Sequence, residues 1–233
     1  MTNPHLTFTA PDGTVRAVAL VLHGGRAKSQ APVRRTNLTV VRMTPFATAL
    51  RRAGGDLGLA VARLRYVVRG WNGGAQSPVA DVRWALNRIA ERYPSVPVAL
   101  VGHSMGGRAA IYSAAAPSVR TVVGLAPWIE PADPVDPIAD RDVLVVHGDR
   151  DRITSPVNSA EWTKRARAIA ESAAYVSVAG ERHAMLHRAT LWHSMTSAYV
   201  VATLLGVPPA ETSSAAGANV IAKVLAGDAS LVV

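Results

Sequence analysis

The chain of 233 residues carries 25 Lys and Arg against 16 Asp and Glu, which gives a formal net charge of +9, and it contains no cysteine. This length allows one large domain or two small ones, and such a chain can bury enough surface to fold without a disulfide or a metal. The lack of cysteine excludes a thiol nucleophile, a disulfide framework and any zinc site with Cys ligands.

Short apolar runs alternate with helix-like segments along the chain. Six runs are predicted to be buried strands, at residues 14–22, 59–66, 96–101, 121–125, 142–146 and 175–178. Helices are predicted at residues 45–52, 79–93, 108–116, 156–171 and 189–205. Short strands rich in β-branched residues, alternating with amphipathic helices, indicate parallel βαβ units. The predicted fold class is therefore α/β, with a mostly parallel, doubly wound sheet flanked by helices and ligands bound at the carboxyl ends of the strands.

Two segments depart from this alternation. Residues 26–44 contain few apolar and many basic residues, and residues 208–217 have the composition of a linker. We expect one domain over residues 1–206, followed over residues 207–233 by a linker and a C-terminal tail with a short helix at 219–225. Three arrangements of the tail are open: docking on the domain, disorder, or pairing with a second subunit in a homodimer.

The segment Gly102-His-Ser104-Met-Gly106-Gly107 follows a predicted strand and precedes a predicted helix. It matches the pattern G-x-S-x-G of a nucleophile elbow, in which a tight turn exposes a serine hydroxyl at a helix N-terminus. Residues two positions on either side of the serine must lack side chains in such a turn, and Gly102 and Gly106 meet that need. Ser104 is therefore the predicted nucleophile.

A serine nucleophile needs a base, and the base needs an acid that orients it. The strand predicted at 142–146 leads into a segment with Asp149 and Asp151, and the strand at 175–178 leads into a segment with His183. Ser104, Asp151 and His183 thus all follow the carboxyl ends of different strands, in the chain order serine, acid, histidine.

Four motifs in this order make the chain resemble an α/β-hydrolase with a serine nucleophile: HGG at 23–25, GHSMGG at 102–107, HGDRDRITSP at 147–156 and GERHAML at 180–186. The resemblance covers about residues 14–205. It implies that Ser104, Asp151 and His183 are catalytic, with Asp149 as the alternative acid. It also implies that no cofactor and no metal takes part.

The same resemblance implies an oxyanion hole made of two backbone N–H groups. One belongs to Met105, the residue after the nucleophile. The other belongs to the loop after the first predicted strand, at Gly25, with Gly24 or Arg26 as alternatives.

Only 16 residues, 126–141, separate the strand at 121–125 from the strand at 142–146, and four of them are proline. This connection is too short for the helical lid that many relatives carry there, so we expect an α/β-hydrolase fold without a lid domain and a comparatively open site. Trp71 and Trp128 follow strand ends and are candidate substrate-binding residues. Arg26 begins the basic segment and is a candidate for the rim of the site.

The expected activity is that of a serine hydrolase cleaving carboxylic esters, with a small-molecule acyl ester or thioester as the substrate. The first alternative is an acyl-thioesterase, and a weaker one is an amidase or peptidase. An alternative that is not an enzyme is a non-catalytic scaffold acting as a binding module.

Positive charge is concentrated in residues 1–120, which hold 16 basic and 4 acidic side chains. No nucleic-acid-binding motif accompanies this charge, so no nucleic-acid partner is expected. The amino-terminal residues do not have the pattern of a signal peptide, and no apolar stretch approaches the ~20 residues of a membrane span. We therefore expect a cytoplasmic protein without integral membrane association.

Overall fold

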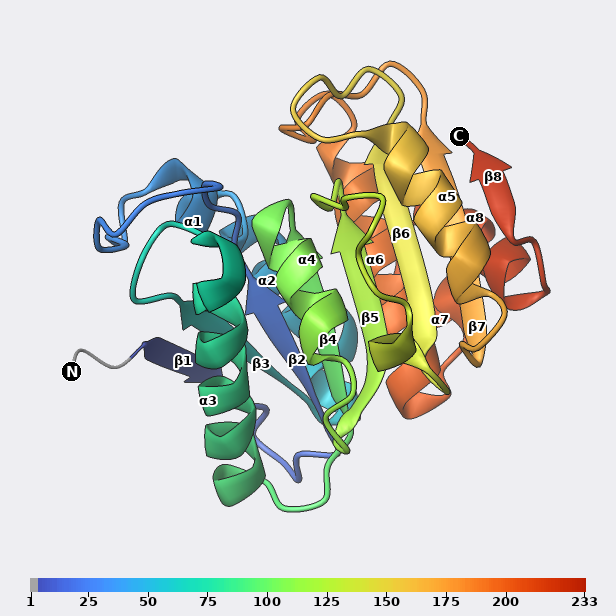
Figure 1. Ribbon diagram of the computed structural model, residues 1–233. Coiled ribbons are helices and arrows are strands. Elements are labelled where there is room, and N and C mark those ends of the chain that lie inside the picture. Colours follow the sequence, from blue (N-terminus) through green and yellow to red (C-terminus); the bar gives the residue numbers. More distant parts are fainter. Residues whose placement is uncertain (1–3) are drawn as a thin grey trace.

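A twisted sheet forms the centre of the protein in the computed structural model, which describes residues 4–233 (Figure 1). Its strand order is β1-β3-β2-β4-β5-β6-β7-β8. The pair β1 and β3 is antiparallel, and every other neighbouring pair is parallel. The strands are β1 (His5–Thr9), β2 (Ala17–Leu22), β3 (Leu59–Arg65), β4 (Val98–His103), β5 (Val119–Leu125), β6 (Asp142–Gly148), β7 (Ser172–Val178) and β8 (Ser230–Val232). The predicted fold class, a mostly parallel sheet flanked by helices, is confirmed.

Helices cover both faces of the sheet (Figure 1). One face packs against α3 (Ser77–Arg92), α4 (Met105–Ser113) and α5 (Pro156–Ala166). The other packs against α2 (Thr44–Gly54), α6 (Ala189–Leu205) and α8 (Ala215–Leu225), while α1 (Leu38–Val41) and α7 (Pro209–Thr212) are single turns. Because the central strands are covered on both sides, every residue of β2 and of β4 is buried.

Two strands were not predicted from the sequence, β1 and β8. Both lie at the edges of the sheet and are half exposed, so they lack the continuous apolar run that marks a strand buried on both faces. Some predicted boundaries also differ: β2 begins at Ala17 rather than at residue 14, and α5 ends at Ala166 rather than at residue 171. The basic segment 26–44 is irregular apart from α1 and the start of α2.

Residues 207–233 lie against the rest of the protein. They form α7, α8 and β8, and β8 pairs in parallel with β7. Ile221 of α8 is fully buried in the core on the face of the sheet that α6 covers, where α8 packs against α6. The closeness of this packing is visible at Gly217, where an added Cβ would lie 2.0 Å from Ser194 Oγ on α6. The tail therefore completes one face of the core.

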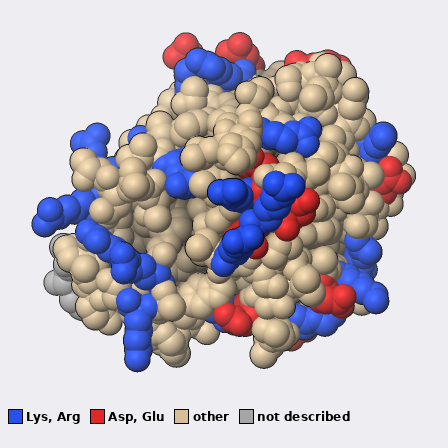
Figure 2. All heavy atoms as spheres, turned by 90° about the horizontal axis from the view of Figure 1, so that it is seen from above, with Lys and Arg blue, Asp and Glu red and all other residues tan. Residues whose placement is uncertain are grey.

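The loops at the carboxyl ends of the parallel strands gather at one edge of the sheet, at the top of Figure 1. The connection from β5 to β6, residues 126–141, contains only the short 3-10 turn Asp136–Ile138 and adds no lid domain. Figure 2 looks onto this edge and shows a group of Lys and Arg side chains near its centre, beside Asp and Glu, and further basic side chains scattered along its left side. Within residues 4–233, none of the helices has the length and apolar character needed to cross a membrane.

Candidate active site

The turn between β4 and α4 places Ser104 at the carboxyl edge of the sheet. Ser104 has φ 56° and ψ −119°, a left-handed backbone conformation that is strained for a residue with a Cβ. Its N–H donates to Leu125 O at 3.0 Å, and its carbonyl accepts from Gly107 N–H and Trp128 N–H, both at 3.0 Å. These bonds to β5, α4 and the loop after β5 hold the strained conformation in place.

Close backbone approach explains the glycines around Ser104. A Cβ on Gly102 would lie 2.2 Å from Gly106 O, and one on Gly106 would lie 2.6 Å from Leu22 O. Real Cβ atoms do not approach backbone oxygen so closely, so both positions require glycine. The two glycines of the G-x-S-x-G pattern are therefore required by the close packing of backbone around the elbow.

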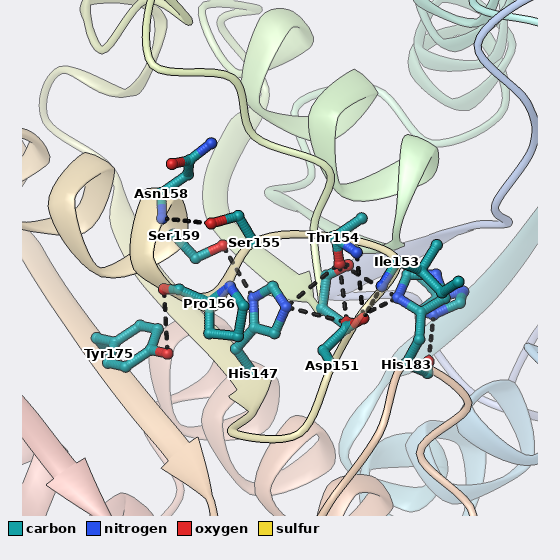
Figure 3. A network of polar contacts seen from close by, with 12 residues as sticks. His147, Asp151, Ile153, Thr154, Ser155, Pro156, Asn158, Ser159, Tyr175 and His183 are labelled. Atoms are coloured by element: carbon teal, nitrogen blue, oxygen red, sulfur yellow. Dashed lines mark hydrogen bonds and ion pairs between the residues drawn. The ribbon is translucent and has the colours of Figure 1, made fainter.

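Asp151 follows β6 and is buried among five hydrogen-bond donors (Figure 3). Its Oδ2 accepts from His183 Nδ1 at 2.8 Å, from Thr154 Oγ1 at 2.8 Å and from His147 Nε2 at 3.0 Å. Its Oδ1 accepts from the N–H groups of Ile153 at 2.8 Å and Thr154 at 3.1 Å. A carboxylate satisfies this many donors only when it is ionised.

Burial alone would raise the pKa of Asp151, but the hydrogen bonds from His147, His183 and Ile153 N–H outweigh it and hold that pKa well below its usual range. Burial also lowers the pKa of His147, which keeps this ring neutral. With its Nε2–H donated to Asp151, the neutral ring of His147 accepts from Ser159 Oγ at Nδ1, at 2.9 Å. Asp151 thus remains a negative charge facing His183.

The loop after β7 carries His183, whose side chain is 19% exposed, whereas the side chain of Asp151 is inaccessible to solvent. His103 Nε2–H donates to His183 O at 3.0 Å, and Arg42 Nη1 donates to the neighbouring Ala184 O. No hydrogen bond joins Ser104 Oγ to His183 within residues 4–233. Such contacts are often long in a free enzyme and shorten when substrate binds.

The structure separates the two candidate acids. Asp149 is exposed, and its Oδ1 accepts from Gly180 N–H at 2.7 Å, which ties the loop after β6 to the loop after β7. Asp151, not Asp149, contacts His183.

The candidate oxyanion loop, residues 24–26, lies directly against Ser104 and Met105. An added Cβ on Gly24 would lie 3.3 Å from Ser104 Cβ, and one on Gly25 would lie 2.3 Å from Met105 Cε. Arg26 N–H already donates to Arg69 O at 2.8 Å, whereas the N–H groups of Gly24 and Gly25 have no acceptor among residues 4–233. Of the three alternatives, Arg26 is therefore the least suitable donor for an oxyanion.

Trp71 and Trp128 are brought together near the start of α4, with their ring centroids 6.2 Å apart. Between them lies Arg108, whose Cζ is 4.6 Å from the centroid of each ring and whose Nη2 contacts Asp133 Oδ1 at 2.5 Å. Both tryptophans border an open cavity of about 540 Å³ that Arg108 and Tyr112 also line. Arg108 lies one helical turn after Ser104, and the N–H groups of Arg108 and Trp128 both donate to Ser104 O.

Three side chains with a clear place in the site were missed from the sequence. Thr154 Oγ1 lies within 3.2 Å of Asp151, His183 and Ala126 O, and Arg108 fills the space between the tryptophans. Arg42 holds the His183 loop from a distant part of the chain. A local signal exists only for the backbone of Thr154, because an aspartate side chain often accepts from N–H groups shortly after it. Nothing in the sequence indicates the partners of Arg42.

Because two histidines, His23 and His103, are buried, we expect the free energy of unfolding to decrease in acid. Burial lowers the pKa of His23 to about 4, and burial together with the charge of His183 lowers the pKa of His103 to about 3. A histidine in the unfolded chain titrates near 6.5, so below that pH the unfolded state binds protons that the folded state does not, and stability falls as the pH falls toward 4. At pH 5 each group is expected to cost about 2 kcal/mol of the free energy of unfolding.

Denaturant unfolding at pH 7.5 and at pH 5 measures this difference. Equal free energies of unfolding at the two pH values would contradict the neutral, buried state of His23 and His103. A smaller loss in a variant with His103→Gln would assign part of the effect to that ring.

Comparisons with known proteins agree with this architecture. A family model described as serine aminopeptidase, S33, matches residues 68–141, a range that includes Ser104. No curated protein matches the chain.

Solved structures give more extensive similarity. An α/β serine hydrolase homologue from Coxiella burnetii is 18% identical, with a TM-score of 0.63 and coverage of 83% of this chain and 90% of that one. A serine hydrolase without a lid from Xanthomonas campestris is 21% identical, with a TM-score of 0.56 and coverage of 79% and 82%. The esterase domain of a Rhodothermus marinus protein is 18% identical, with a TM-score of 0.56 and coverage of 88% and 97%. The chain is therefore identified as a protein of the α/β-hydrolase fold, in the compact form without a lid domain.

Proposed function

We propose that this protein is a serine hydrolase that cleaves carboxylic esters through an acyl-enzyme on Ser104. The observation that carries the proposal is the contact of His183 Nδ1 with the buried carboxylate of Asp151, at 2.8 Å, beside the strained elbow that presents Ser104. An ionised, inaccessible carboxylate fixes the tautomer of His183 with hydrogen on Nδ1, and this leaves Nε2 free to act as a base.

In the first half of the reaction, Ser104 Oγ attacks the acyl carbonyl while His183 Nε2 removes the hydroxyl proton. The imidazolium that forms is stabilised by Asp151, whose charge is maintained by the other donors around it. His183 then gives the proton to the departing alcohol oxygen, and the acyl group remains on Ser104.

The negative charge on the tetrahedral intermediate needs donors that are already in place. The N–H of Met105, the first residue of α4, and the N–H of Gly25 are the proposed donors. The contact between these two residues, together with the unused N–H of Gly25, supports this assignment over Arg26. Each such donor is worth roughly 3 kcal/mol in the transition state.

In the second half, a water molecule attacks the acyl-enzyme. His183 removes a proton from that water and returns it to Ser104 Oγ as the acid product leaves, so the enzyme is restored. The short connection from β5 to β6 leaves this face open to water, which favours hydrolysis over transfer to another acceptor.

The cavity beside Trp71 and Trp128 is the proposed place for part of the substrate. None of Ser104, Asp151 and His183 lines it, but two of its lining residues, Arg108 and Trp128, donate their N–H groups to Ser104 O. Two aromatic rings and Tyr112 offer apolar surface for an acyl or aromatic group. The charged lining residues are Lys28, Glu130 and Arg108, and Arg108 is paired with Asp133. Arg26, the last residue of the candidate oxyanion loop, is exposed, and we place it against the part of the substrate that extends out of the cavity.

A substrate panel tests the reaction type. We expect the butanoyl oxygen ester to be hydrolysed at least tenfold faster, in kcat/KM, than the anilide of the same acid, because an alcohol leaves more readily than an amine. The butanoyl thioester belongs in the same panel. A higher kcat/KM for the thioester would assign the protein as an acyl-thioesterase instead, and no hydrolysis of any member by folded protein would favour a non-catalytic scaffold.

A further inference from the structure

A second cavity, of about 410 Å³, lies at the edge of the sheet formed by the carboxyl ends of the parallel strands, over the ends of β2 and β3. Its lining contains neither Ser104, Asp151 nor His183, and it shares no residue with the cavity beside Trp71. It is therefore separate from the proposed substrate cavity, and the lining residue that comes nearest in sequence to the oxyanion loop is His23.

The path of α2 explains how this cavity forms. Leu59 and Val61 of β3 pack beneath α2, and the same face of the strand continues with Arg63 and Arg65. Because α2 begins at Thr44, its body does not extend over these two arginines. Residues 35–44 pass over them instead, and the space left between this segment and the sheet is the cavity.

Three arginines line the cavity, Arg35, Arg63 and Arg65, and no Asp or Glu is among the lining residues. None of the three takes part in an ion pair within residues 4–233. Each guanidinium carries five N–H donors. Arg63 Nη1 donates to Thr44 Oγ1 at 3.2 Å and Arg65 Nη1 donates to Val33 O at 2.9 Å, which leaves most of their donors unused.

The other nine lining residues are mixed in character: five are apolar, Val21, Val40, Val41, Met43 and Leu64, and four are polar, His5, Thr7, His23 and Thr44. Polar and apolar surface thus lie side by side in a space that fits a small molecule. Several guanidinium groups without a carboxylate match a phosphate group in charge and in hydrogen-bonding geometry. The apolar residues match a short carbon chain.

We propose that this cavity binds a small organic phosphate, with the phosphate on Arg35, Arg63 and Arg65 and its carbon chain against the apolar wall. The site is distinct from the one at Ser104, and its occupation does not depend on the hydrolase reaction.

Calorimetric titration with butyl phosphate tests the proposal on the full chain. Saturable binding is expected, with at least a tenfold increase in Kd for Arg35→Gln and for Arg63→Gln, and no binding of uncharged n-butanol. Lys28→Gln, in the cavity beside Trp71, and Arg83→Gln, exposed on α3, remove the same charge elsewhere and are expected to change Kd less than twofold.

Arg35 is exposed and makes no side-chain hydrogen bond among residues 4–233, so its substitution is expected to leave the unfolding temperature unchanged. This separates loss of binding from loss of folding. No saturable binding by the unaltered protein would overturn the proposal. It would also be overturned if Lys28→Gln weakened binding as much as Arg35→Gln, because the phosphate would then occupy the other cavity.

Discussion

Substitution Ser104→Ala is expected to reduce kcat/KM for ester hydrolysis about 10⁴- to 10⁶-fold, because it removes the only atom that forms the acyl-enzyme. Alanine is compatible with the fold at this position, since Ser104 Oγ makes no hydrogen bond with His183 that the fold would lose. The backbone bonds of Ser104 to Leu125, Gly107 and Trp128 are kept in the variant. The free energy of unfolding is therefore expected to change by less than about 1 kcal/mol.

A matched control is available on the same helix. Ser113 is buried near the end of α4, and its Oγ has no hydrogen-bond partner among residues 4–233. Ser113→Ala is expected to change kcat/KM less than twofold. An esterase activity that survives Ser104→Ala would assign the hydrolysis to another group or to a contaminant.

Asp151→Asn is expected to lower kcat about 10⁴-fold, as removal of the orienting acid does in other Ser-His-Asp enzymes. An asparagine amide donates where the carboxylate accepts, so His183 loses the partner that keeps hydrogen on Nδ1. His147 and Thr154 also lose an acceptor, and we therefore expect a loss of stability of a few kcal/mol, since buried donors are left unpaired. Activity is measured on protein shown to be folded by near-ultraviolet circular dichroism.

Asp149→Asn is the companion variant that decides between the two candidate acids. Asp149 is exposed, and among residues 4–233 its side chain accepts a hydrogen bond only from Gly180 N–H, a role that the asparagine oxygen can keep. Its kcat is expected to change less than threefold. A large loss with Asp149→Asn and a small one with Asp151→Asn would reverse the assignment.

The elbow and the six buried strands were predictable because each imposes a strict local requirement on the sequence. Gly102 and Gly106 have no room for a Cβ, and strands buried on both faces are strongly apolar, as β2 is throughout and β4 is up to Gly102. These constraints are visible in the sequence without knowledge of tertiary contacts. The choice of Asp151 over Asp149 came from the family resemblance, and the contact with His183 now gives it a geometric reason.

Features that depend on distant contacts were not predictable. Arg42 reaches Ala184 across 142 positions in sequence, and Arg108 stands between two tryptophans that come from separate loops. Of the basic segment 26–44, only Arg26 was a candidate for the rim of the catalytic site, and the sequence left the place of the other arginines open. One of them, Arg35, lines the separate cavity over β2 and β3. Pattern alone does not place such side chains, because their positions follow from how the loops pack.

The most direct test of Ser104 as the nucleophile is covalent labelling. Folded protein is treated with a fluorophosphonate, digested with trypsin, and the modified residue is located by tandem mass spectrometry in the peptide spanning residues 93–108. The account predicts one adduct per chain, on Ser104 and not on Ser95 of the same peptide, and no adduct after Ser104→Ala. Folded protein that takes up no label, or that carries the label on a different residue, would contradict it.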